Sequence, residues 1–263
     1  MPNVSRVLIL INDHKVFTRI IKLFSSYVES GFIYFTKTGF YISGMDHSHT
    51  CLVKCVMGED TLVYTPPEDE FNIGVSFVIL HKILNSCSSS TSTVLKASTD
   101  NNILEISVRE PRGKHKYKLS LIELDSDEME VPEMDYVVER ELDTACVKDA
   151  IDNVEKLGAD TFTLTQVERG DLRIKYSTDY IEGDVVIEES RRSCVESSVM
   201  LSTNFAKGFI SSGPYGPKTI ISYTHDEIPV RFKCPLVGKD NKISERDYVE
   251  IHIAPRTTDD DED

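Results

Sequence analysis

Residues 43–53 read Ser-Gly-Met-Asp-His-Ser-His-Thr-Cys-Leu-Val, and this stretch is the most informative part of the chain. If it continues as a strand, His47, His49 and Cys51 lie on one face together with Cys55. Two histidines and two cysteines could ligate a zinc ion. A closed site would require Cys55 to reach past an intervening side chain. We therefore favour a loop that leads into a strand, with buried cysteines and surface histidines.

The composition around this stretch is that of a folded protein. The chain has 263 residues, 40% of them hydrophobic and 28% charged, which is enough for one large domain or for two of about 130 residues. It has no apolar run of about 18 residues and no signal-peptide layout at the N-terminus. Its six cysteines include no CxxC pair and are expected to be reduced. We expect a soluble intracellular protein without membrane partners.

The net charge of −15 is unevenly distributed. Residues 1–122 carry 13 basic and 11 acidic side chains, whereas residues 123–263 carry 16 and 33. The total argues against non-specific nucleic-acid binding over the whole surface, but it does not exclude a local basic stripe.

The most acidic stretch lies at the middle of the chain. Residues 123–143 hold ten acidic side chains and one base, Arg140. Like charges extend a segment, and Pro132 removes a backbone donor. We interpret the stretch as a connector between two halves of similar size; a solvated loop without a role is the alternative.

Both halves show the same rhythm of two helices among alternating strands. Helical spacing predicts helices over about 14–28, 76–86 and 144–157, and a fourth short helix after Ser202. The remaining segments alternate apolar and polar residues, as antiparallel strands do. Basic side chains fall on the helix faces opposite the apolar ones, which suggests one selectively basic surface in an acidic protein.

Motifs of common enzymes are absent from the sequence. There is no GxGxxG after a strand, no GxxxxGK[ST], and no GxSxG, HExxH or HRD-type motif. The sequence therefore gives little support to a nucleotide-using enzyme or a hydrolase, and we predict neither catalysis nor a cofactor nor a bound metal.

Residues 43–53 resemble the "MDSSHVxLV" segment of the proliferating cell nuclear antigen family, the sliding clamps of eukaryotes and archaea. Four further segments agree in order and spacing. They are Phe35–Phe40 (the first hairpin), Leu121–Asp125 with Val131–Glu133 (the "LxDxD…IPE" connector), Glu227–Val230, and Ile253–Arg256 before an acidic tail ("LAPK"). The ordered set spans nearly the whole chain.

The resemblance implies an α+β clamp fold of two similar domains, each with antiparallel sheets outside and two helices on the inner face. The domains would be 1–122 and 136–256, joined by an acidic connector at 123–135 and followed by a disordered acidic tail at 257–263. Three chains would form a head-to-tail ring around duplex DNA, held by sequence-independent phosphate contacts.

The family places basic helix residues along the hole of the ring. The matching residues here are Lys15, Arg19, Lys22, Lys82, Lys148, Lys156 and Lys207. Asp149 and Asp152 stand where the family commonly has bases, so we expect DNA contact to be biased toward the first half.

In the family, clients insert a short motif with aromatic plugs into an apolar pocket under the connector. The matching positions are Met45, His49, Thr50, Leu52, Met129, Val131, Pro132, Ile228, Pro229, Ala254 and Pro255. Thr50 and His252 replace residues that are commonly more apolar or aromatic, so we expect a more polar pocket.

Ring closure would pair the edges of two strands of opposite charge, near 113–120 and 182–189. The interface residues would be Lys116, Tyr117, Lys118, Asp184, Val185 and Ile187.

The resemblance therefore implies a homotrimeric DNA sliding clamp, a processivity factor in DNA replication and repair. It would tether a DNA polymerase, a clamp loader and other proteins that carry clamp-interacting motifs. Its location would be the nucleus, or an intracellular replication site if the protein is viral. One alternative is a subunit of a heterotrimeric checkpoint-type clamp. A hydrolase or metalloprotein that uses His47, His49 and the cysteines is another, and zinc content would test it.

Overall fold

A computed structural model describes residues 4–87, 90–124, 134–166, 171–188, 197–211, 215–224 and 228–256. The chain divides into two compact units, Met1–Glu130 with Pro235–Val249, and Val131–Cys234 with Glu250–Asp263. The stretch 235–249 belongs to the first unit by its contacts. For example, Asp247 accepts a hydrogen bond of 2.7 Å from the Thr61 hydroxyl. The sequence places that stretch in the second domain, and the remaining boundaries stay a prediction.

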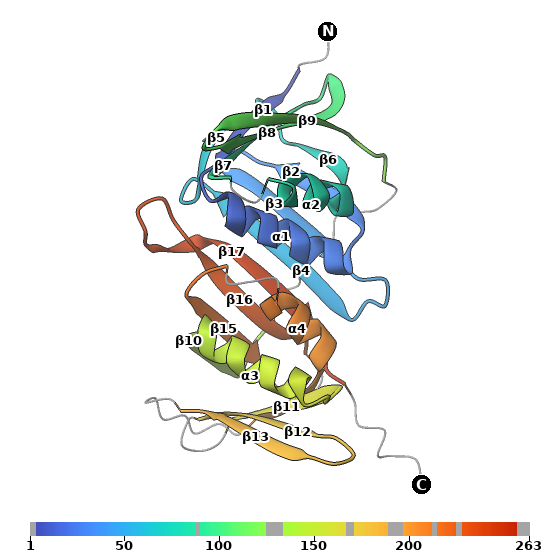
Figure 1. Cartoon of the computed structure of the whole chain (residues 1–263), viewed down its shortest axis with the longest axis vertical. Coiled ribbons are helices and arrows are strands. Elements are labelled where there is room, and N and C mark those ends of the chain that lie inside the picture. The colour runs from blue at the N-terminus through green and yellow to red at the C-terminus, as the bar shows by residue number, and fades with distance from the viewer. Residues whose placement is uncertain are drawn as a thin grey trace. The chain divides into compact units, whose positions relative to one another are not determined.

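The first unit contains two helices, a five-stranded sheet and part of an eight-stranded sheet (Figure 1). Its strands are ordered β5-β1-β7-β8-β9 in one sheet and β17-β4-β3-β2-β6 in the other. The elements are β1 (Arg6–Ile11), α1 (His14–Tyr27), β2 (Ser30–Phe35), β3 (Gly39–Met45), β4 (Cys51–Gly58), β5 (Leu62–Thr65), β6 (Phe71–Ser76), α2 (Phe77–Asn85), β7 (Ser92–Ser98), β8 (Asn101–Glu110), β9 (Gly113–Ser120) and most of β17 (Ile243–Ile253).

The pattern of apolar residues explains these elements. Alternate residues of β8 point into the core, and the buried face of α1 is apolar. Asp13 begins α1 by accepting a hydrogen bond of 2.9 Å from the Val16 amide. The rings of Phe24 on α1 and Phe77 on α2 lie 5.2 Å apart, which locks the two helices side by side.

The second unit repeats this plan. Its strands are ordered β13-β12-β11-β14 in one sheet and β10-β15-β16-β17 in the other. The elements are β10 (Val138–Asp143), α3 (Thr144–Lys156), β11 (Thr161–Gln166), β12 (Leu172–Ser177), β13 (Glu182–Ile187), β14 (Ser197–Ser202), α4 (Thr203–Ser211), β15 (Lys218–Tyr223), β16 (Val230–Val237) and the end of β17.

Helix α3 packs beside α4 and buries Val147, Ile151 and Val154. It ends at Lys156, and Gly158, two residues beyond, has a φ of +79°, the left-handed conformation that favours glycine after a helix. On α4 the Phe209 ring is fully buried and lies 6.3 Å from the Phe232 ring of β16. The described strands thus form three antiparallel sheets, and each unit has one helix pair, as the predicted α+β arrangement requires. None of the described helices is both long and apolar enough to cross a membrane.

Candidate nucleic-acid interface

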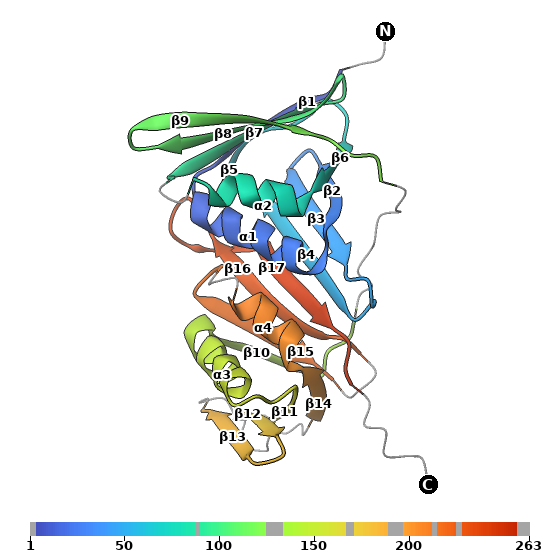
Figure 2. The ribbon, with the colours of Figure 1, turned by 45° about the vertical axis from the view of Figure 1, so that its right-hand side comes forward.

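The first unit presents a basic helix face. Lys15, Arg19 and Lys22 lie at positions i, i+4 and i+7 of α1, so they share one side of the helix. Helix α2, which carries Lys82, lies beside α1 (Figure 2). The three lysines are exposed and form no ion pair with any residue that the structure describes. Burial, and then the nearby charge of Lys22, lower the pKa of His81, so the cationic character of this face at neutral pH comes from the lysines and Arg19.

The helix face of the second unit is largely neutralised. Lys148 forms an ion pair with Asp152 one turn further along α3. Lys207 of α4 forms an ion pair with Glu155 of α3. Only Lys156, among the three predicted lysines of this unit, is exposed without an ion pair to a described residue. A phosphate at this face would compete with carboxylates that are already in place.

Two terminal strands carry the predicted self-association residues. Among the described strands, β9 ends one sheet of the first unit and β13 ends one sheet of the second. Lys116, Lys118 and Asp184 are exposed, and Asp184 is bonded to Arg173 of the neighbouring strand at 3.0 Å. The other predicted residues, Tyr117, Val185 and Ile187, alternate with them and are half-buried. No other described strand pairs with the outer edge of β9 or β13, and the exposed charges of these two strands are of opposite sign.

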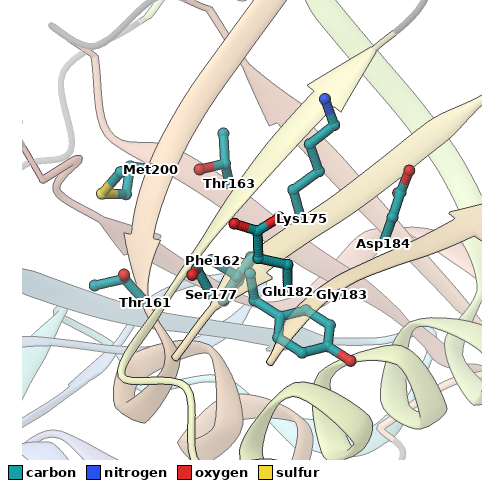
Figure 3. A pocket seen from close by; sticks show the side chains of 10 residues that line it. Thr161, Phe162, Thr163, Lys175, Ser177, Glu182, Gly183, Asp184 and Met200 are labelled. Carbon is teal, nitrogen blue, oxygen red and sulfur yellow. The ribbon is translucent and has the colours of Figure 1, made fainter. Parts of the chain in front are cut away.

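A hollow of about 570 Å³ lies over the sheet that β13 ends (Figure 3). Lys175, Glu182 and Asp184 stand on the same side of this sheet. On the opposite side, Gly183 lies against the ring of Tyr176, and a Cβ atom at Gly183 would come within 2.1 Å of that ring. Tyr176 in turn donates a hydrogen bond of 3.0 Å to Asn153 of α3. The edge strand β13, with Gly183 packed against Tyr176, forms part of the lining of this hollow.

The loop in residues 43–53 is organised by one carboxylate. Asp46 accepts hydrogen bonds from the amides of Thr50 at 2.8 Å and Cys51 at 2.6 Å, and from the hydroxyl of Ser48. Burial alone would raise the pKa of Asp46, but these bonds outweigh it and hold the pKa below its ordinary value. His49 adopts a φ of 57° in the same turn.

The predicted client residues lie at the ends of strands. Met45 ends β3, Leu52 is buried in β4, and His49 and Thr50 form the turn between these strands. Half-buried residues precede β16 and follow β17; they are Ile228, Pro229, Ala254 and Pro255. Met129, Val131 and Pro132 lie outside the described residues.

Both described ends of the predicted connector are anchored. At its start, the Ile122 amide donates a hydrogen bond of 3.0 Å to the carbonyl of Gly74 in β6. Beyond its end, the ring of Tyr136 lies beneath the Arg231 guanidinium, 4.9 Å from its centre, and the Tyr136 hydroxyl lies 3.4 Å from His252 Nδ1. The acidic segment thus begins and ends at fixed points of the fold.

The zinc alternative at residues 47–55 is wrong for this structure. No three of the ligand atoms of His47, His49, Cys51 and Cys55 come within 4.8 Å of one another. The cysteines are buried in β4, and burial raises the pKa of both thiols far above the ordinary value, whereas the histidines are exposed in the turn. The ion pair between Lys148 and Asp152 was not predicted, although the i, i+4 spacing of the two residues could have indicated it. The ion pair between Lys207 and Glu155 was not predicted either.

Comparisons with known proteins agree with this geometry. Residues 9–129 match the family model of the proliferating cell nuclear antigen, N-terminal domain. The chain is 24% identical over 245 residues to a probable DNA polymerase sliding clamp 2 of Paramecium bursaria Chlorella virus 1, covering 92% of this chain and 87% of the relative. It is 22% identical over 253 residues to the DNA polymerase sliding clamp of Thermococcus fumicolans, covering 95% and 98%.

Two solved structures show the same fold. The proliferating cell nuclear antigen of Thermococcus kodakaraensis superposes with a TM-score of 0.82 at 19% identity, covering 95% of this chain and all of that one. A chain of the PCNA2–PCNA3 complex of Sulfolobus tokodaii gives 0.81 at 16% identity, covering 95% and 99%. Sliding clamps are processivity factors in DNA replication rather than enzymes. The comparisons therefore confirm the predicted α+β clamp fold over nearly the whole chain, and they support a divergent sliding clamp of the proliferating cell nuclear antigen type, whose homologues are not enzymes.

Proposed function

We propose that three copies of this chain close head to tail into a ring that encircles duplex DNA. The observation that carries the proposal is that, among the described strands, β9 and β13 each end a sheet and carry exposed charges of opposite sign. An edge strand with unpaired backbone groups favours pairing with another chain, and two different edges favour a closed ring of identical subunits. The predicted interface residues supply both the charge and the half-buried apolar side chains.

The proposed DNA contact uses the basic helix faces. Retention by enclosure needs no tight grip, and phosphate contacts without base readout permit sliding. The exposed Lys15, Lys22 and Lys82 support a contact through the first unit. The ion pairs of Lys148 and Lys207 support a weaker contact through the second. The excess of acidic side chains elsewhere would repel DNA from other surfaces.

The proposed tethering function uses the residues that match the family's client pocket. Replication and repair proteins, including a DNA polymerase and a clamp loader, would dock with short peptide motifs. Basic residues that flank such a motif would pair with the acidic segment at 123–135. The proposed location is the nucleus, or an intracellular viral replication site, which the similarity to a viral clamp supports.

Light scattering after gel filtration, at micromolar and at nanomolar protein concentration, tests ring formation. We expect a mass three times 29.7 kDa at the higher concentration, and persistence on dilution for a stable ring. A monomer at every concentration would contradict the proposal of a homotrimer. The chain would then be a subunit of a ring built from different chains. The similarity to a chain of the PCNA2–PCNA3 complex supports this alternative.

Peptide binding tests tethering separately. A fluorescent peptide with a clamp-interacting motif should bind the wild-type protein and bind the Ile228→Asp variant more weakly. Ile228 is half-buried and lies just before β16. The matched control is Val237→Asp, an exposed apolar residue at the end of the same strand. Equal loss in both variants would contradict a specific pocket.

A further inference from the structure

The described residues contain one group of metal-ligating side chains that the clamp function does not use. It comprises Cys87 after α2, Glu110 at the end of β8 and His115 on β9. Their ligand atoms all lie within 4.8 Å of one another, and His115 Nε2 lies 3.2 Å from Glu110 Oε2. The three residues follow no metal-binding spacing in the sequence, so the sequence alone does not indicate this group.

The register of the β8–β9 hairpin explains why these side chains converge. His115 pairs with Val108 and Tyr117 pairs with Ile106, so both side chains lie on the face of the sheet that buries the core. Glu110 continues the same face of β8 one alternation beyond Val108. On the core-facing side of the hairpin, the apolar side chains of β8 are thus followed by Glu110, with His115 on the paired strand. These two side chains lie close to Cys87, just after the end of α2.

We propose that Cys87, Glu110 and His115 bind one Zn²⁺ ion. A thiolate, an imidazole and a carboxylate are the ligand types that zinc accepts, whereas Mg²⁺ and Ca²⁺ prefer an all-oxygen shell. Three protein ligands leave a fourth tetrahedral position for water. The Cys87 side chain is 1% exposed and that of His115 is 48% exposed, so the site has a buried ligand and an opening to solvent.

Neighbouring groups would support the ligands. The Tyr117 hydroxyl lies 3.4 Å from Cys87 Sγ, and the Ser86 hydroxyl lies 3.7 Å from the same sulfur. Both hydroxyls can donate hydrogen bonds to a bound thiolate, as groups around zinc ligands commonly do. The imidazole of His115 is nearly parallel to the Tyr117 ring, at 12° with centroids 6.4 Å apart, which restricts its orientation. A bound ion would join α2 to the β8–β9 hairpin and stiffen the β9 edge.

The test measures metal binding by the whole chain. Zn²⁺ bound to the purified protein is titrated against a chromophoric chelator, and Co²⁺ is added to the metal-free protein as a spectroscopic probe. We expect one equivalent of Zn²⁺ per chain and a thiolate-to-cobalt charge-transfer band. Cys87→Ser should abolish both zinc binding and the cobalt band. His115→Gln and Glu110→Gln should each lower the affinity for Zn²⁺ at least about tenfold.

Matched controls identify the site. Cys146→Ser removes an exposed cysteine elsewhere, and the paired change His47→Asn with His49→Asn removes two exposed histidines. Both should retain one equivalent of Zn²⁺ and the cobalt band. His115 and Glu110 are not buried, so their variants keep the test valid if Cys87→Ser folds poorly. Absence of zinc binding by the wild-type chain, or loss that follows Cys146 or the two control histidines, would overturn the proposal, whether or not the chain forms a ring.

Discussion

The two units have the same plan, yet their helix faces differ in what surrounds each lysine. In the first unit, Lys15, Lys22 and Lys82 have no carboxylate partner among the described residues. In the second, Lys148 and Lys207 are held by Asp152 and Glu155. The number of basic residues on a helix therefore does not measure its potential for phosphate. The local carboxylates decide how much of that charge is free for a ligand.

The edges of the two units differ as well. The β9 edge carries lysines that form no ion pair with a described carboxylate, whereas Asp184 on β13 already shares its charge with Arg173. The β13 edge is also packed more tightly. Gly183 lies against Tyr176, whereas a Cβ atom added at Gly113 on β9 would meet no other atom within 4 Å. The two partners of one proposed interface should therefore respond differently to mutation.

The largest effect is expected from Gly183→Ala. The added methyl group would collide with the Tyr176 ring, which should displace β13 and destabilise the second unit by about 2–3 kcal/mol. Light scattering should show loss of the trimer, and thermal unfolding should show a lower Tm. Gly113→Ala, the matched change on the other edge, should preserve both. A similar loss of trimer and of Tm in both variants would show that the β9 and β13 edges do not differ in packing.

A smaller effect is expected on DNA affinity when each helix face is neutralised. The triple change of Lys15, Lys22 and Lys82 to Gln should weaken binding to a short duplex about tenfold and reduce its salt dependence. The corresponding change of Lys148, Lys156 and Lys207 should weaken binding about threefold at most, because two of these charges are already paired. Fluorescence anisotropy at two salt concentrations measures both. Equal losses of duplex affinity would show that the helix faces of the two units contribute equally to DNA binding.

The converse change should strengthen binding slightly. Asp152→Asn with Glu155→Gln releases Lys148 and Lys207, so duplex affinity should rise about two- to threefold. The control is Asp179→Asn with Glu59→Gln, which removes the same charge at exposed positions away from the helices. An equal gain in the control would indicate that net charge, and not the release of particular lysines, sets the affinity.

The smallest effect concerns acid stability in the second unit. Burial alone would raise the pKa of Glu250, but the imidazole of His252, whose Nε2 lies 3.3 Å from the carboxylate, and the charges of Lys233 and Arg231 outweigh burial and hold the pKa below the ordinary 4.5. Stability from this group is therefore present above pH 4.5 and is lost as the pH falls through the lower, folded-state pKa. Glu250→Gln should flatten this part of a plot of Tm against pH.

The matched control for the acid effect is Glu245→Gln, an exposed carboxylate on the same strand. It should leave the dependence of Tm on pH as it is in the wild-type protein. If Glu250→Gln and Glu245→Gln behave alike, the buried pair with His252 does not contribute to acid stability.

Much of the fold could be predicted from local pattern. The helix predicted over 14–28 is observed at His14–Tyr27, and that over 144–157 at Thr144–Lys156. The sequence also predicted the opposite charges of β9 and β13, the two strands that each end a sheet in the structure. Such features depend on the periodicity of a helix or a strand, which a few consecutive residues encode. The assignment of 235–249 to the first unit was not predicted, because it depends on pairing between segments far apart in the chain.

The sequence by itself thus determined where the helices and strands lie, which faces are apolar, and that the first half carries the more basic helices. Only the tertiary structure decided which of those charges are free. The bond between Lys207 and Glu155 joins residues 52 positions apart, and the group of Cys87, Glu110 and His115 joins a helix end to a hairpin. The physical reason is that ion pairs and metal ligands require contact within a few ångströms, and the packing of distant segments sets those distances.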